Sequence, residues 1–271
     1  MNINGKVAVV KGEEGGIGRA VALDLAKRQV SALALVDKTE LVHELATELN
    51  GLIGRSVATG YTGDVTEETF RSWVYQDLHE KHGIVNICVP AAGITRDSLA
   101  VKVDKQQGTV VIYPTKTFRL VTEVNLIAPI YWALEMLAGI AEYRRKNGLK
   151  RWEPTEELLG TVIFIGSVSS QGNKGQLSYS ATKAGLEGAA STLTAEGIFH
   201  GVRCGIIHPG FTDTPMVRAL GEDYIQENII PQTQLRRLIQ PEEIADAICF
   251  MISNSAVSGS LWADAGWRPA A

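Results

Sequence analysis

Short apolar runs alternate with helical patterns along the whole chain of 271 residues. Between these runs, Leu41, Leu45 and Leu49 recur at every fourth position, which places them on one face of a helix. Strands that are apolar throughout and separated by helices indicate a parallel sheet buried on both faces. We therefore expect an α/β protein, a single domain with a doubly wound parallel sheet and helices on both faces. The runs that predict strands are 7–10, 32–36, 55–59, 85–89, 161–165, 202–207 and 261–263.

The composition fits such a fold, since 45% of the residues are hydrophobic and 21% are charged. A net charge of −4 disfavours a nucleic-acid partner, because such proteins usually carry a basic face. Cys88, Cys204 and Cys249 lie far apart in apolar runs, which indicates buried, reduced thiols and no metal site. The sequence predicts no signal peptide and no apolar run long enough to span a bilayer, so we expect a cytoplasmic protein without a membrane partner.

A glycine-rich turn, "KGEEGGIGRA", follows the first predicted strand. Gly12, Gly16 and Gly18 lie between strand and helix, where a backbone without Cβ atoms can approach a pyrophosphate and present helix N–H groups to it. Glycines also occur in such turns without a ligand. The spacing matches neither GxGxxG nor a phosphate-binding loop ending in GK[ST], which disfavours an ATPase.

Acidic residues follow the next two strands. Asp37 ends the second strand, where a carboxylate can accept hydrogen bonds from the adenosine ribose hydroxyls and repel a 2′-phosphate. A capping or solvated aspartate is the alternative. Glu13 and Glu14 add negative charge that also favours NAD, whereas Lys38 is the one local feature that favours NADP. Asp64, in "GDV" after the third strand, is placed to receive the adenine amino group.

The motifs, taken in order, resemble those of the classical short-chain dehydrogenase/reductases nearly from end to end. They are the glycine turn, "GDV", "AAGITRD", "VNL", "SYSATK", "HPGFTDTPM" and "VSGSLWADAG". "GITRD" and "GNKGQLSYSATKAGLEG" are most similar to the 3-oxoacyl-carrier-protein and acetoacetyl-CoA reductase branch. The resemblance implies a single NAD(P)-binding Rossmann-fold domain over residues 1–271.

The stretch "SYSATK" places Tyr179 and Lys183 one helical turn apart on one face. The resemblance makes Tyr179 the general acid/base and gives Lys183 a second role in binding the nicotinamide ribose. A free phenol titrates near ~10, and a nearby ammonium lowers that pKa towards neutrality. A half-buried tyrosine beside a solvated lysine is the alternative for such a pair without this context.

Two further catalytic positions follow from the resemblance. Ser167, in "FIGSVSS", matches the serine that positions the substrate oxygen, with Ser169 and Ser170 as competitors. Asn125, in "EVNL", matches the asparagine that holds a helix open around a water relay to the active-site lysine.

The resemblance also implies the rest of the cofactor site. Pro209 and Gly210 shape the loop beneath the nicotinamide, while the Thr212 backbone and the Thr214 hydroxyl bind its carboxamide. Residues 215–235 match a mobile substrate lid. The remaining expected contacts are Ile17, Val65, Ala92 and Gly93.

The pattern departs from the family at two places that face each other. Lys11 stands where relatives usually have threonine, and Pro90 and Ala91 stand where they have two asparagines. In the family these side chains tie the first βα turn to the end of the fourth strand. We expect one local rearrangement, with Gly93 still allowing close approach of a cofactor.

Two insertions distinguish the chain, near 101–115 and 143–159. In the first, "VKVDKQQGTVVIYP" alternates around Gln107 and Gly108 and predicts a β-hairpin. This hairpin either walls the substrate pocket, packs on a neighbouring subunit or is passive surface. The second contains a basic group that either docks an acidic carrier protein or forms a solvated charged loop. Its basic residues are Arg144, Arg145, Lys146, Lys150 and Arg151, partly offset by Glu153, Glu156 and Glu157.

We therefore expect a soluble NAD-dependent oxidoreductase that interconverts a secondary alcohol and a ketone. The alternatives are an NADPH-dependent 3-oxoacyl reductase and a catalytically silent nucleotide-binding relative. The resemblance also implies a homotetramer or homodimer, with the helices that contain Asn125 and Tyr179 at the interface.

Overall fold

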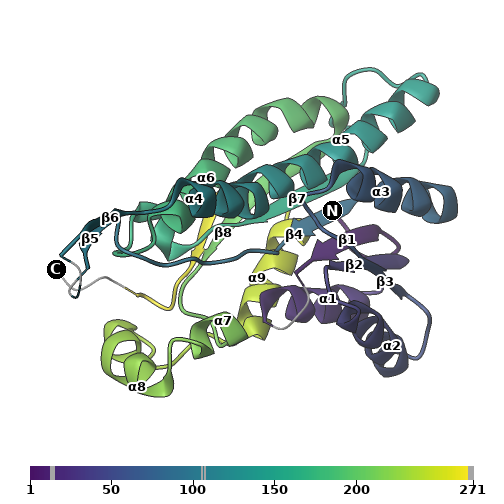
Figure 1. Cartoon of the computed structure of the whole chain (residues 1–271). Helices are drawn as coiled ribbons and strands as arrows, with labels where there is room; N and C mark the ends of the chain where they lie inside the picture. Colours follow the sequence, from purple (N-terminus) through teal and green to yellow (C-terminus); the bar gives the residue numbers. More distant parts are fainter. Residues whose placement is uncertain (13–15, 105, 107, 268–271) are drawn as a thin grey trace.

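A seven-stranded parallel sheet forms the centre of the protein (Figure 1). The computed structural model describes residues 1–12, 16–104, 106 and 108–267. The strand order is β3-β2-β1-β4-β7-β8-β9. The strands are β1 (Val7–Lys11), β2 (Ala32–Asp37), β3 (Ala58–Thr62), β4 (Ile87–Pro90), β7 (Gly160–Ile165), β8 (Val202–Pro209) and β9 (Gly259–Ala263). This architecture confirms the predicted doubly wound α/β fold.

Helices cover both faces of the sheet because the side chains of each strand alternate between them. Ala8 and Val10 of β1 pack in one hydrophobic cluster with helices α1 (Ile17–Lys27), α2 (Leu41–Ile53) and α9 (Pro241–Ser253). Val7 and Val9 pack in the opposite cluster with α3 (Glu68–His82), α5 (Ala128–Lys146) and α6 (Leu177–Gly197). Every strand residue of β1 and β2 is buried, as expected for strands covered on both sides.

The strand order reverses between β1 and β4. From β1 the chain continues outward to β2 and β3, then crosses back to β4 on the other side. In a doubly wound sheet, ligands bind outside the carboxyl ends of the strands at such a switch point. The glycine turn, residues 91–100 and the segment after β8 all follow strands at this edge.

The third strand differs from its predicted position of 55–59. It runs from Ala58 to Thr62, because the preceding residues close the loop after α2. That helix ends at Gly54, which is left-handed with φ 73°. The Asn50 side chain then accepts hydrogen bonds from the backbone N–H groups of Val57 at 2.7 Å and Ala58 at 2.8 Å. The Asn50 side chain therefore fixes where β3 begins, and strand propensity alone does not predict such a contact.

One helical run contradicts the expectation that no segment could span a bilayer. Residues 115–146 form one continuous helical run of α4 (Thr115–Thr122), the π-helical segment η1 (Glu123–Ile127) and α5, and this run is long enough and contains a stretch apolar enough to cross a membrane by length and composition. Its central side chains Trp132, Met136 and Ile140 are fully buried in the core. The run therefore packs as a core helix against β4 and β7.

All three cysteines are free and buried, as predicted. Burial raises the pKa of Cys88 to about 11 and that of Cys204 to about 12, so both thiols are protonated at neutral pH.

Candidate active site

Tyr179 and Lys183 lie together on the first turns of α6, as the four-residue spacing predicts. The Lys183 Nζ lies 5.5 Å from the centre of the Tyr179 ring and donates a hydrogen bond of 2.7 Å to the carbonyl of Ile165, the last residue of β7. Burial lowers the pKa of Lys183 to about 8. This hydrogen bond holds the lysine at the carboxyl end of β7, beside the phenol.

Ser167 follows β7 by two residues and reaches the same point. Its side chain acts to lower the pKa of the Tyr179 phenol, but the larger effect of burial raises that pKa overall. Its Oγ also accepts a bond of 3.1 Å from the Ser169 N–H at the start of the short 3₁₀ segment η2 (Val168–Gln171). The competing Ser169 hydroxyl instead contacts Asn173.

His208 of β8 contacts the backbone of Ser167. It was not predicted as a site residue. Its imidazole Nδ1 lies 3.4 Å from the Ser167 N and 3.3 Å from the Ser167 carbonyl, and its ring stacks on Trp262 with centres 4.2 Å apart. The imidazole is fully buried, which lowers its pKa. A histidine that ends an otherwise apolar strand, "CGIIHP", was the available signal.

Asn125 lies in η1, the π-helical segment between α4 and α5. Its amide clamps the backbone of Ile94, accepting from the N–H and donating to the carbonyl, both at 2.8 Å. The nearest atoms to an added Cβ at Gly93 would be the Asn125 Oδ1 at 3.5 Å and the Lys183 Nζ at 3.8 Å. The structure therefore brings Gly93, Asn125 and Lys183 together, as the resemblance implies.

The glycine turn presents a helix start at the same edge. Gly16, with φ 93°, is the N-cap of α1 and has no side chain with which to cap that helix. A Cβ at Gly12 would lie 2.6 Å from the Ala92 backbone, and one at Gly18 would overlap the Gly12 carbonyl. The N–H groups of the first turn of an α-helix have no partner within the helix itself, and in α1 this turn begins at Ile17. This arrangement fits the pyrophosphate of a dinucleotide.

The two predicted adenosine contacts also lie at this edge. Asp37 ends β2, and its Oδ1 accepts the N–H of Lys38 at 2.7 Å. Asp64 follows β3, and hydrogen bonds from Thr66 lower its pKa. Val65, next in the chain, accepts a bond from the buried Trp132 indole. Glu13 and Glu14 lie outside the described residues.

The segment after β8 lies at the same carboxyl-end edge of the sheet, on the side of β9. A Cβ at Gly210 would lie 2.7 Å from the backbone of Asp264, so the chain passes close to the end of β9 there. Thr212 is buried, and a Cβ at Gly16 would lie 2.6 Å from the Thr214 methyl. Thr214, which follows Pro209 and Gly210 at the end of β8, therefore packs against the glycine turn.

The predicted lid residues form a separate helical unit below this edge (Figure 1). They comprise α7 (Pro215–Arg218), α8 (Glu222–Tyr224), the π-helical η4 (Ile225–Ile229) and the 3₁₀ segment η5 (Ile230–Gln232). Their core is a small cluster of its own, centred on Ile225, Ile229 and Leu238. This packing is separate from the two clusters that cover the sheet.

The family departures do face each other, as expected. Lys11 pairs in register with Pro90 across β1 and β4, and its side chain is fully buried. Ala91 follows, with its N–H bonded to the Val89 carbonyl at 3.0 Å. The polar tie expected for the family is replaced by a buried lysine beside a proline.

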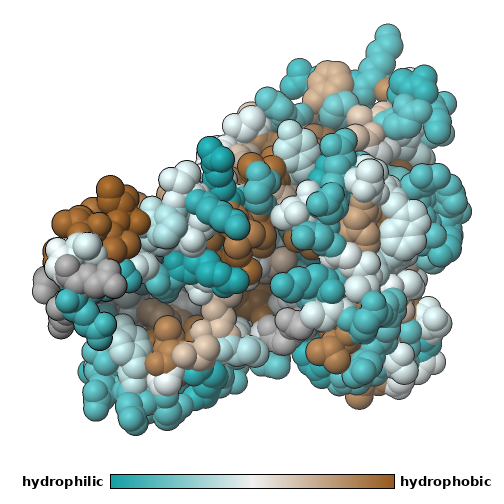
Figure 2. All heavy atoms as spheres, viewed as in Figure 1, coloured by the Kyte–Doolittle hydropathy of each residue, from teal (hydrophilic) through white to brown (hydrophobic). Residues whose placement is uncertain are grey.

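The first insertion forms the predicted hairpin, β5 (Val101–Val103) with β6 (Val110–Ile112). One face of it is aliphatic, and each of its four side chains is more than half exposed (Figure 2). These four are Val101, Val103, Val110 and Ile112.

The base of the hairpin is tied to the residues before Tyr179. The buried Tyr113 hydroxyl lies 2.8 Å from the Ser178 Oγ and donates to the Arg96 carbonyl at 2.7 Å. The Gln176 side chain donates to Asp97 at 2.9 Å. These contacts favour a hairpin that borders the Tyr179 site over one that is passive surface.

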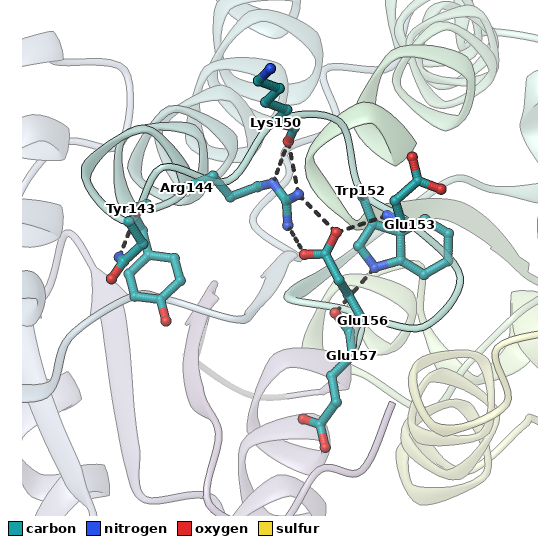
Figure 3. Close-up of polar contacts among 8 residues, drawn as sticks. Tyr143, Arg144, Lys150, Trp152, Glu153, Glu156 and Glu157 are labelled. Carbon is teal, nitrogen blue, oxygen red and sulfur yellow. Dashed lines mark hydrogen bonds and ion pairs between the residues drawn. The ribbon is translucent and has the colours of Figure 1, made fainter.

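One of the five basic residues of the second insertion is buried in an ion pair, and the other four are exposed (Figure 3). Arg144 is 2% exposed, and its guanidinium donates to Glu156 at 2.6 and 3.1 Å and to the Lys150 carbonyl. Arg145 and Lys146 both pair with Glu142. The loop also precedes β7, so it lies at the amino ends of the strands, opposite the Tyr179 edge.

Comparisons with known proteins agree with this geometry. A family model described as "Enoyl-(Acyl carrier protein) reductase" matches residues 12–267. The 3-oxoacyl-[acyl-carrier-protein] reductase of Escherichia coli K12 is 30% identical over 257 residues, covering 94% of this chain and 93% of that protein. The acetoacetyl-CoA reductase of Synechocystis is 33% identical over 259 residues, covering 95% and 92%. The chain therefore belongs to the short-chain dehydrogenase/reductase family of oxidoreductases, in the branch of these two reductases.

Proposed function

We propose that this protein reduces the ketone of a 3-oxoacyl thioester to a secondary alcohol with a nicotinamide cofactor. The relatives' names favour this substrate class, which the sequence offered as the alternative to an unspecified ketone. The observation that carries the chemistry is the meeting of Ser167, Tyr179 and Lys183 at the carboxyl end of β7. We propose that residues 1–271 form one NAD(P)-binding domain.

Two hydroxyl groups then act on one oxygen. The Ser167 and Tyr179 hydroxyls both donate hydrogen bonds to the ketone oxygen, and Tyr179 transfers its proton as negative charge develops there. The bound nicotinamide supplies the hydride. Lys183 stabilises the phenolate left behind, because its ammonium lies against the ring.

Two groups behind Tyr179 hold this arrangement. Lys183 is fixed by the Ile165 carbonyl, and Asn125 fixes the backbone of Ile94 beside Gly93. We propose that Asn125 supports the proton relay that restores the tyrosine proton through Lys183.

The preferred cofactor in this proposal is NADH. Asp37 lies at the end of β2 with its carboxylate partly held by the Lys38 N–H, in the place of a ribose-binding acid. The 2′-phosphate that NADPH carries on this ribose would be repelled by the Asp37 carboxylate. NADPH would bind well only with Asp37 turned away towards solvent.

The same proposal includes a cytoplasmic homotetramer or homodimer. Exposed apolar side chains on α4 to α6 support an interface there. They are Leu120, Ile127, Tyr131 and Leu177. An acidic carrier protein, if it delivers the substrate, would have to approach the Tyr179 edge and not the second insertion.

The test is reduction of acetoacetyl-CoA by the full-length protein with NADH and, separately, with NADPH. We expect turnover with NADH and at least ~10-fold lower kcat/KM with NADPH. Tyr179→Phe should bind NADH almost as tightly and lose nearly all turnover, because only the transferable proton is removed. Tyr143→Phe, which changes an exposed tyrosine on α5, is the matched control. Substantial turnover by Tyr179→Phe would refute the mechanism, and NADH binding without any reduction of the thioester ketone would favour a silent relative.

A further inference from the structure

Lys11 is a buried charge at the centre of the cofactor edge. It is the last residue of β1, pairs in register with Val36 of β2 and Pro90 of β4, and directly precedes Gly12. It therefore lies where the strand order reverses, under the point where a dinucleotide crosses a doubly wound sheet. Its side chain is 0% exposed.

Nothing in the described part of the chain satisfies the Lys11 ammonium. Its Nζ has no hydrogen-bond partner among those residues and lies 5.9 Å from the centre of the Trp132 ring. A cation over an indole gains a modest attraction, which is far smaller than the cost of burying an unpaired ammonium. The buried ammonium of Lys11 therefore destabilises the protein without ligand, and a structural role alone does not account for it.

Among the described residues, the charged and titratable groups around Lys11 include more cations than carboxylates. Lys183 of α6 and Arg71 of α3 are cations, whereas Cys88 of β4 is a protonated thiol. Arg71 is paired with Glu135 of α5 at 3.4 Å.

The carboxylate near Lys11 is Asp64, after β3. It is exposed and already accepts two hydrogen bonds from Thr66. Burial, which Cys88 and Asp64 oppose only in part, lowers the pKa of Lys11 to about 7.

We propose that Lys11 is the counter-ion of the bound cofactor's phosphates, and that cofactor binding is therefore coupled to uptake of one proton by the Lys11 amine. The inference rests on the proposed use of a nicotinamide dinucleotide. Such a ligand brings two negative phosphate charges to the glycine turn, whose first residue is the neighbour of Lys11. In a site of low dielectric these charges favour the ammonium form, so a proton passes from solvent to the Lys11 nitrogen as the ligand binds.

This coupling requires an affinity that depends on pH. An opposite charge nearby raises a pKa by roughly 1–3 units, and a rise of about 1 unit, the lower end of that range, corresponds to roughly half a proton taken up per NADH near pH 8. The affinity of the protein for NADH should therefore weaken by about tenfold between about pH 6.5 and about pH 9. Lys183 is the competing source, because burial lowers its pKa to about 8 and it is expected to contact the ribose.

The experiment is calorimetric titration of the full-length protein with NADH in buffers of different ionisation enthalpy, which counts protons without any catalytic step. We expect the wild type to take up a proton in part, Lys11→Met to take up almost none, and the affinity of Lys11→Met to vary little with pH. Lys27→Met, which removes an exposed lysine at the end of α1, is the matched control and should behave like the wild type.

Each other outcome is decisive. Uptake that persists in Lys11→Met and disappears in Lys183→Met would overturn the inference and leave the proposed function intact. Binding without any proton uptake by the wild type would do the same. Failure to bind either NADH or NADPH would overturn the proposed function and the inference together.

Discussion

Replacing Lys11 with methionine should stabilise the protein, more strongly at and below neutral pH than in alkaline solution. Methionine fills nearly the same volume beside Trp132 and removes the unpaired ammonium. The pKa of Lys11 is lowered from 10.5 to about 7 in the folded protein, so the unfolded chain binds this proton more tightly. The folded state therefore loses stability as the pH falls from 10.5 towards 7, and the loss is complete below 7.

The size of the effect follows from that shift. Linkage gives a cost of about 4 kcal/mol near pH 7 and about 1 kcal/mol near pH 9.5. Lys11→Met should thus exceed the wild type in free energy of unfolding by up to these amounts, and the difference between the two proteins should shrink by about 3 kcal/mol as the pH rises. Other titrating groups, Lys183 among them, are present in both proteins and cancel in the comparison.

The assay is urea unfolding of both proteins without cofactor near pH 7 and near pH 9.5, followed by tryptophan fluorescence. A stability difference that does not change with pH would show that Lys11 keeps an ordinary pKa. A variant that is less stable than the wild type near pH 7 would refute the reasoning, because it would mean that the ammonium has a favourable partner.

Two further predictions concern the insertions. Glu156→Gln should lower the Tm by several degrees, because it leaves the buried Arg144 guanidinium without its carboxylate partner. It should not change kcat/KM, because this pair lies far from the Tyr179 edge. Thermal unfolding checks the prediction with Glu153→Gln as the control, and an unchanged Tm would contradict the role of the pair. Tyr113→Phe should cost about 1 kcal/mol of stability and lower kcat while leaving the NADH affinity unchanged, because it removes the bond to Ser178 beside Tyr179. Steady-state kinetics and NADH titration check the second prediction, and an unchanged kcat would show that the hairpin does not influence the site.

The repeating apolar pattern was sufficient to predict the sheet, its doubly wound connections and the hairpin at 101–112. Strand and helix periods record which face of each element is buried, and parallel order follows because buried strands alternate with helices. Likewise, Tyr179 and Lys183 had to share a helix face, since their spacing is local. For the same reason, glycines between the first strand and helix marked the ligand edge.

Tertiary structure alone decided the partners of the charged groups. Five basic residues near 143–159 read as a patch, but Arg144 turns inward to Glu156 and its neighbours pair with Glu142. The sequence marked Lys11 as a departure from the family, and only the fold shows that it is buried beside Trp132. Only the fold shows that His208 contacts the backbone of Ser167, 41 residues before it in the chain. Charge is a property of one residue, whereas its compensation depends on which distant atoms the fold brings within reach, and no sequence period records that.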